Sequence, residues 1–127
     1  INDPLLMIMD EPFRGLDAMS RELMQEFFVR LFEEGGRTNL FVTSEIEEAI
    51  FLADRVVVLS NCPTSVRKVI DIKLPRPRDF HQLTSSEAFD YKREAMELLH
   101  EEALKGFTGS AGESQKEFME SLTKHPD

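Results

Sequence analysis

The chain has 127 residues, of which 41% are hydrophobic and 31% charged, so it is long enough for one modest globular domain with its own core. The formal net charge of −9 argues against a surface that binds nucleic acid or anionic membranes non-specifically. Cys62 is the only cysteine, which excludes an intramolecular disulfide, and no apolar run approaches the ~20 residues needed to span a membrane.

The first predicted element is a strand in which five apolar residues, 5–9, run into Asp10 and Glu11 before Pro12 ends the run. A short apolar run bounded by a breaker is typical of a strand buried on both faces of a parallel sheet. In open α/β sheets, ligands bind at the carboxyl ends of the strands, where both carboxylates would lie. One carboxylate could then hold a metal while the other orients a water. The alternative, a buried strand followed by an acidic turn, is favoured by these residues when they are taken alone.

A long helix is predicted over residues 18–34. Asp17 is placed as its N-cap, and Gly35 and Gly36 form a strong C-terminal stop. Two adjacent rows of apolar residues at i, i+4 spacing predict one broad face that packs on a sheet. We expect the members of that face to be core residues rather than cofactor contacts: Met19, Leu23, Phe27 and Leu31, with Met24, Phe28 and Phe32 beside them.

Residues 39–43 predict a second buried strand, followed by a short helix. Ser44 and Glu47 have the spacing of a capping box at the start of that helix. The helix is expected to point Ile46, Ala49, Ile50 and Ala53 inward and Glu45, Glu47 and Glu48 outward. Residues 55–60 predict a third strand. Strands alternating with helices indicate a parallel α/β sheet with right-handed crossovers.

The pattern changes after residue 60. A turn at 61–65 leads into an alternating strand over 66–74, which predicts a hairpin with the preceding strand. Residues 75–78, Pro-Arg-Pro-Arg, predict a stiff, extended linker. The last predicted helix starts at Ser85 or Ser86, ends near Leu104, and carries Phe89, Met96, Leu99 and Ala103 on one side. Residues 106–114 are expected to be disordered, with a frayed turn around Phe118, Met119 and Leu122.

Taken together, these pieces resemble the second half of an ABC transporter ATPase. Residues 5–12 resemble the Walker B motif with its catalytic glutamate, 15–17 the D-loop, and 42–49 the switch-loop position, and 52–59 continue the match. Residues 70–79 and the helix after them resemble the tail of the ATPases of nitrate, sulfonate and taurine importers.

The resemblance implies an α/β fold, a partial P-loop NTPase (ABC ATPase) domain with parallel strands and flanking helices. This domain part would cover residues 1–78, followed by a helical extension at 79–105 and a disordered tail at 106–127. The implied cofactors are ATP and Mg²⁺.

The resemblance also implies roles for four residues. Asp10 would bind Mg²⁺ through a water, and Glu11 would act as the general base on the attacking water. Asp17 would reach across a dimer of two such domains, a role compatible with that of a plain helix cap. Ser44 stands where the family normally has a histidine that touches the γ-phosphate. We interpret Ser44 as a capping residue rather than a catalytic one, and its presence leaves full hydrolytic competence open.

The sequence contains no G-x-x-x-x-G-K-[ST] loop, glutamine loop or ABC signature. Because the sequence also starts at Ile1, we expect the chain to be the C-terminal portion of a longer ATPase and to be inactive alone. Its sheet would then expose an apolar edge, and an isolated fragment would be unstable or would associate. The three histidines, His81, His100 and His125, have no metal-ligand spacing and are expected to be solvated.

The leading functional hypothesis is the ATP-hydrolysing subunit of an importer for nitrate, sulfonate or taurine-like anions. Its expected partners are a second ATPase subunit, permease subunits and an external substrate-binding protein, at the cytoplasmic face of the membrane and without nucleic acid. Two alternatives stay open. One is a non-catalytic interaction module that lacks the phosphate loop, and the other is a soluble, non-transport ABC ATPase of DNA repair or translation. The resemblance implies no particular transported substrate, because specificity in such importers lies mainly with the external binding protein and the permease.

Overall fold

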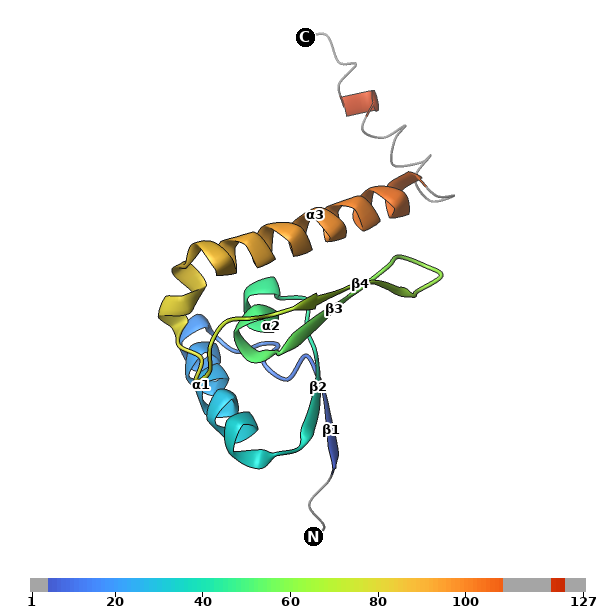
Figure 1. The fold of residues 1–127 in the computed structure, drawn as a ribbon. Helices are drawn as coiled ribbons and strands as arrows, with labels where there is room; N and C mark the ends of the chain where they lie inside the picture. The colour runs from blue at the N-terminus through green and yellow to red at the C-terminus, as the bar shows by residue number, and fades with distance from the viewer. Residues whose placement is uncertain (1–4, 109–119, 123–127) are drawn as a thin grey trace.

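A computed structural model describes residues 5–108 and 120–122 of the chain. The strands and α-helices of residues 5–108 follow one another in the order that the sequence predicts, with a short 3₁₀ helix, η1, before the last helix (Figure 1). Their bounds are β1 Leu6–Asp10, α1 Ala18–Gly35, β2 Thr38–Val42, α2 Ile46–Leu52, β3 Arg55–Leu59, β4 Val66–Asp71, η1 Phe80–Thr84 and α3 Ser86–Thr108. Because α3 continues to Thr108, the expected disorder from residue 106 is wrong for its first three positions. The rest of the expected tail lies mostly outside the described residues.

The strands form two separate pairs rather than one parallel sheet. β1 and β2 pair in parallel, joined through α1. β3 pairs in antiparallel fashion with β4, with an irregularity between Val58 and Leu59. The predicted hairpin is therefore confirmed. The prediction that residues 55–60 join the parallel sheet is wrong, since the turn after β3 returns β4 beside it as a local partner.

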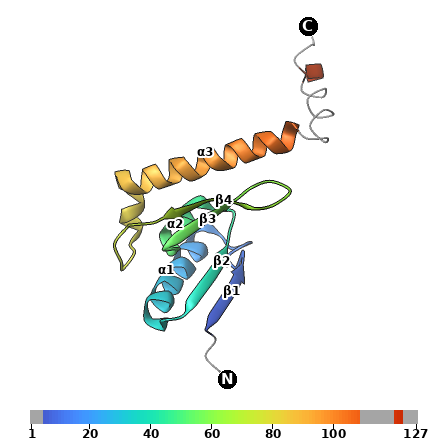
Figure 2. The same cartoon turned by 45° about the vertical axis from the view of Figure 1, so that its right-hand side comes forward.

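One hydrophobic core lies between the hairpin, α2 and α3. In Figures 1 and 2, α3 runs along one side of the β3–β4 hairpin, and α1 with β1 and β2 lies on the other side. Ala88 and Ala95 are buried on α3, and their small side chains let the helix approach the hairpin closely. The predicted apolar side of this helix, with Phe89, Met96 and Leu99, is exposed instead. The packing side is the one spaced at 88, 91, 95 and 98.

A second core cluster joins α1, α2 and the loop after β1. Its buried members are Phe13, Val29, Phe51 and Leu52, with several phenylalanines packed around them. Phe28 and Phe32 of α1 take part, as predicted. The other members of the predicted face are exposed, and that part of the prediction is wrong: Met19, Leu23, Met24, Phe27 and Leu31. The physical reason is that a sheet of two strands is too narrow to cover so broad a helix face.

The predicted burial of β1 on both faces is also wrong. Ile8 is 63% exposed, and Leu6 and Leu40 are exposed too. Within the described residues, β1 has β2 along one edge and no strand along the other. This leaves an apolar sheet edge of the kind expected from the sequence. Association of the isolated chain through this edge stays a prediction.

Helix α2 is enclosed by its neighbours more completely than its pattern suggests. Ile50 is buried as predicted, but Phe51 and Leu52 are buried as well. Glu48, predicted to face outward, is only 5% exposed and accepts a hydrogen bond of 2.6 Å from Gln25 Nε2 of α1. A helix packed on several sides does not follow the two-faced pattern of a surface helix.

None of the helices in the described part of the chain is long and apolar enough to cross a bilayer.

Candidate active site

The candidate site lies at the carboxyl ends of the two parallel strands. The register pairs Asp10 with Val42, so β1 and β2 end side by side. The backbone N–H of Glu11 then donates to the carbonyl of Val42 over 2.8 Å, which extends the ladder by one bond. This geometry brings the acidic pair next to residues 43 and 44, as expected for neighbouring parallel strands.

Glu11 is held in an unusual conformation at this edge. Its φ of 45° lies in the left-handed region, which is uncommon for a residue other than glycine and unfavourable by about 1–3 kcal/mol. Its Oε1 accepts a hydrogen bond of 2.8 Å from the backbone N–H of Ser44. Arg14 Nη2 lies 3.9 Å from the same oxygen, but Arg14 is largely exposed, so that ion pair is weak. The turn and the Ser44 N–H together fix where this carboxylate points.

Asp10 is the last residue of β1, and its side chain is exposed. Carboxylate oxygens are the ligands that Mg²⁺ prefers, and Mg²⁺ is commonly bound through one or two carboxylates together with phosphates and waters. An exposed carboxylate at the end of this strand fits that donor set. Groups of three or more metal-ligating side chains are absent from the described residues, so Asp10 would have to share the ion with ligands from elsewhere.

The predicted capping box at Ser44 is wrong. The N-cap of α2 is Glu45, and no side chain caps the helix there. Thr43 Oγ1 accepts a bond of 3.0 Å from the Glu45 N–H, while Ser44 contributes its own N–H to Glu11. The helix begins one residue later than predicted, and the Ser44 N–H that a capping box would pair with Glu47 donates to Glu11 instead.

Asp17 caps α1 as predicted, one loop away from Glu11. Its Oδ1 accepts a hydrogen bond of 2.7 Å from the Ser20 N–H. That bond lowers the pKa of the Asp17 carboxyl from its ordinary value of 3.8. Gly36 ends the helix in the left-handed conformation, with φ 56°, as the predicted stop requires. Gly15, with φ 87°, provides the turn before the cap.

The lowered pKa of Asp17 predicts a pH dependence of stability. Its contribution is fully present above the unfolded-state pKa and is lost as the pH falls through the lower folded-state pKa. Urea unfolding should give a higher free energy of unfolding for the wild-type chain than for the Asp17→Asn variant near neutral pH. This difference should shrink when the pH falls below the ordinary pKa of 3.8. Asn is the matched control because it caps a helix without titrating. A difference that grows on acidification would contradict this assignment.

Several residues that support the site were not found by reading the sequence. Arg21 of α1 lies 3.7 Å from Glu45, at the start of α2. Glu48 and Gln25 join the same two helices farther along, and Arg76 and Arg78 contact the end of α2. These contacts link segments far apart in the chain, and no local pattern marks them. The alternation of proline and arginine at 75–78 was the one sequence feature that could have pointed to the contacts of Arg76 and Arg78.

A hollow of about 350 Å³ lies between α1 and residues 77–80. It is lined by charged groups, among them Glu26, Arg30 and Asp79, and by Phe51 and Phe80. Neither Asp10 nor Glu11 lines it, so it is separate from the candidate site.

Comparison with known proteins gives consistent matches. An uncharacterised ABC transporter ATP-binding protein of Methanocaldococcus jannaschii is 39% identical over 104 residues, which cover 82% of this chain and 38% of that protein. An aliphatic sulfonates import ATP-binding protein of Bacillus cereus is 44% identical over 78 residues, covering 61% of the chain and 31% of the relative. A nitrate import ATP-binding protein of Synechococcus elongatus is 38% identical over 99 residues, which cover 76% of this chain and 36% of that protein.

The chain thus spans about a third of the length of these curated relatives. No protein-family model matches it.

Proposed function

We propose, from the premise that this chain is a homologue of the ATP-binding proteins of ABC transporters, that it carries the Walker B side of an ATP-hydrolysing site. In this proposal Glu11 is the general base, Asp10 is the Mg²⁺ ligand, and the second half of the site comes from outside residues 5–108. The observation that carries the proposal is the contact between the Glu11 carboxylate and the Ser44 N–H at the ends of β1 and β2.

Glu11 has the features that a general base needs. The Ser44 N–H holds Oε1, and no hydrogen bond from the described residues reaches Oε2. A free carboxylate oxygen can take a proton from an attacking water while the other oxygen keeps the group oriented. The left-handed backbone at Glu11 supports the same assignment, since residues in unfavourable backbone conformations cluster at functional sites.

Asp10 would help hold Mg²⁺, which when bound neutralises charge on the β- and γ-phosphates. The neighbouring position, Ser44, differs from the histidine of the family. The group that holds Glu11 is the backbone N–H of this residue, which any amino acid except proline supplies. The orientation of Glu11 therefore does not depend on a histidine, although the contact of that histidine with the γ-phosphate would be lost.

We further propose that the parent protein is an ATP-binding subunit of an importer for anions such as nitrate or sulfonate. Relatives named for sulfonates and for nitrate match the chain at 44% and 38% identity, so the proposal covers both kinds of anion. The proposed partners are a second ATPase subunit facing Asp17, permease subunits and an external binding protein, at the cytoplasmic face of a membrane. Residues 1–78 are proposed as the ATPase part and 79–105 as a helical extension.

The test is a chimera in which this chain replaces the matching stretch of the Bacillus cereus relative. We expect the purified chimera to hydrolyse Mg-ATP, because Asp10 and Glu11 would complete a site whose phosphate-binding part the relative supplies. A matched chimera that carries Asp10→Asn lacks the proposed Mg²⁺ ligand and should bind Mg-ATP more weakly. A chimera that binds ATP but has no hydrolysis above background would contradict the proposed role of the chain.

A further inference from the structure

Two arginines cap the C-terminal end of α2. In any helix the last carbonyls have no partner within the helix, and they are stabilised by cations. Here Arg78 Nη1 donates to the carbonyls of Ile50 over 2.8 Å and Phe51 over 3.4 Å, and Arg76 Nη2 donates to the carbonyl of Leu52 over 2.8 Å. The final three carbonyls of α2 are therefore all bound by guanidinium groups.

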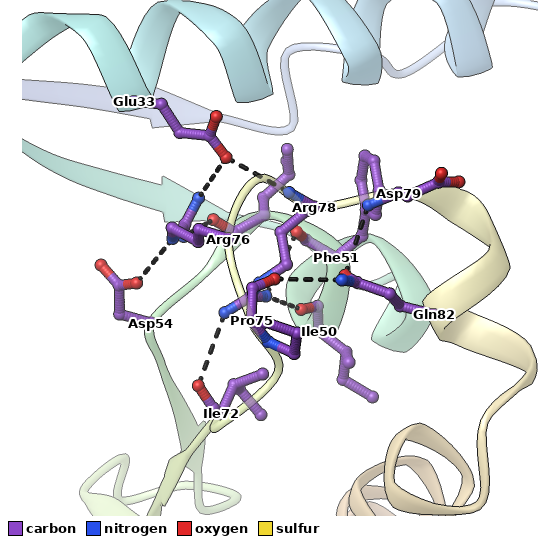
Figure 3. A network of polar contacts seen from close by, with 11 residues as sticks. Glu33, Ile50, Phe51, Asp54, Ile72, Pro75, Arg76, Arg78, Asp79 and Gln82 are labelled. Atoms are coloured by element: carbon purple, nitrogen blue, oxygen red, sulfur yellow. Dashed lines mark hydrogen bonds and ion pairs between the residues drawn. The ribbon is translucent and has the colours of Figure 1, made fainter.

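The same arginines are anchored on other elements, as Figure 3 shows. Glu33 of α1 lies 3.5 Å from Arg76 Nη1 and accepts a bond of 3.3 Å from the Arg78 N–H. Arg76 Nε also donates to Asp54, and Arg78 Nη2 to the carbonyl of Ile72. Arg78 is only 7% exposed, and this burial, followed by the nearby charge of Arg76, lowers the pKa of its guanidinium. Residues 75–78 are thus anchored to the fold, and the linker prediction is wrong.

The opposite end of α2 adjoins the candidate site. The helix has seven residues, about 10 Å at 1.5 Å per residue, and it starts two positions after the Ser44 N–H that binds Glu11. A helix this short is marginal in isolation, so its position depends on the groups that bind its ends and sides. No side chain caps its N-terminal end. Packing and the Gln25–Glu48 bond hold its sides, and the two arginines hold its C-terminal end.

We infer that Arg76 and Arg78 are positioning residues for Glu11 and act through α2. They fix the C-terminal end of the helix, the helix fixes the backbone at Ser44, and the Ser44 N–H orients the carboxylate. The catalytic meaning of this link rests on the proposed function. The link itself is a property of the folded chain and requires no nucleotide.

Hydrogen exchange of the Ser44 amide in the full chain tests the link. Arg78→Gln removes three hydrogen bonds of the guanidinium group. Arg76→Gln changes a less buried residue and provides the test if Arg78→Gln does not fold. Each should speed exchange of the Ser44 amide by about fivefold, the equivalent of one hydrogen bond. Arg67→Gln is the matched control, because Arg67 binds Glu101 and Glu102 of α3 and does not contact α2.

The same measurement in a Glu11→Ala background separates positioning from general loosening. Without the acceptor, the Ser44 amide should exchange fast, and the arginine substitutions should add nothing further. An unchanged Ser44 amide in both arginine variants would overturn the inference. A uniform acceleration that includes the β3 amides at 56–58 would overturn it too, because it would report only a loss of overall stability.

In the chimera, the arginine variants should lower kcat more than they change KM, because the inferred link acts on the orientation of Glu11 and leaves Asp10 in place. An unchanged kcat would show that Glu11 is oriented without them. Because amide exchange is measured without ATP, a failure of the proposed hydrolysis would leave that result intact, and the two proposals fail separately.

Discussion

Glutamine in place of Glu11 is expected to lower kcat of the chimera for ATP hydrolysis by about 10²–10⁴-fold, the range that a positioned general base supplies. ATP binding should be retained, because Glu11 acts on the attacking water and not on the bound nucleotide. Steady-state hydrolysis and calorimetric titration with Mg-ATP measure the two quantities separately. This is the largest functional effect that the structure predicts for one substitution.

The Glu11→Gln substitution separates the orientation of the side chain from its ability to accept a proton. A glutamine amide oxygen can still accept the hydrogen bond of 2.8 Å that the Ser44 N–H donates to Glu11. The backbone turn and the end of the β1–β2 sheet should therefore remain as they are. What is lost is the negative charge that lets the side chain take a proton from water.

Glu22→Gln provides a matched control on the same chain. Glu22 is an exposed residue of α1 and takes no part in the contacts around Glu11. Its substitution changes the net charge equally and should leave kcat unchanged. Normal hydrolysis by Glu11→Gln would remove Glu11 from its proposed role. Loss of both ATP binding and the folded spectrum would instead indicate that Glu11 is needed for folding.

Features that depend on adjacent residues were predictable from the sequence. The Asp17 cap and the Gly36 stop bound α1 as expected, because each works through backbone groups a few residues away. The β3–β4 hairpin is likewise local, with a short turn between alternating strands. The contact between Glu11 and the Ser44 N–H was not predicted, and the capping role given to Ser44 is wrong.

The burial of individual side chains depends on tertiary packing and could not be predicted from helical periodicity. Apolar residues at helical spacing indicated a buried face on α1, but burial also requires a surface of matching width, and the β1–β2 pair does not supply one. On α3, two alanines provide the packing side, while the larger Phe89 and Met96 are exposed. Glu48 and Arg78 are buried because partners distant in sequence satisfy them.

Phe51 and Phe27 test whether burial, rather than residue type or helical position, sets the contribution of a side chain to stability. Both are phenylalanines on α-helices. Phe51 is 2% exposed and stacks on Phe80 with ring centroids 4.3 Å apart, while Phe27 is 57% exposed. Phe51→Ala should lower the free energy of unfolding by about 3–5 kcal/mol, as expected for removing a buried aromatic side chain. Phe27→Ala should change it by no more than about 0.5 kcal/mol. Urea unfolding monitored by circular dichroism measures both.

A loss of that size approaches the whole stability of many small domains, so the comparison also needs a variant with a smaller expected loss. Phe51→Leu keeps most of the volume and removes the stack, and should cost less than about 1.5 kcal/mol, which keeps the comparison measurable. Equal effects at positions 51 and 27 would contradict the burial described for α2. Because Phe51 lies on the helix that follows Ser44, its loss should also speed exchange of the Ser44 amide, whereas substitution of Phe27 should leave that amide protected.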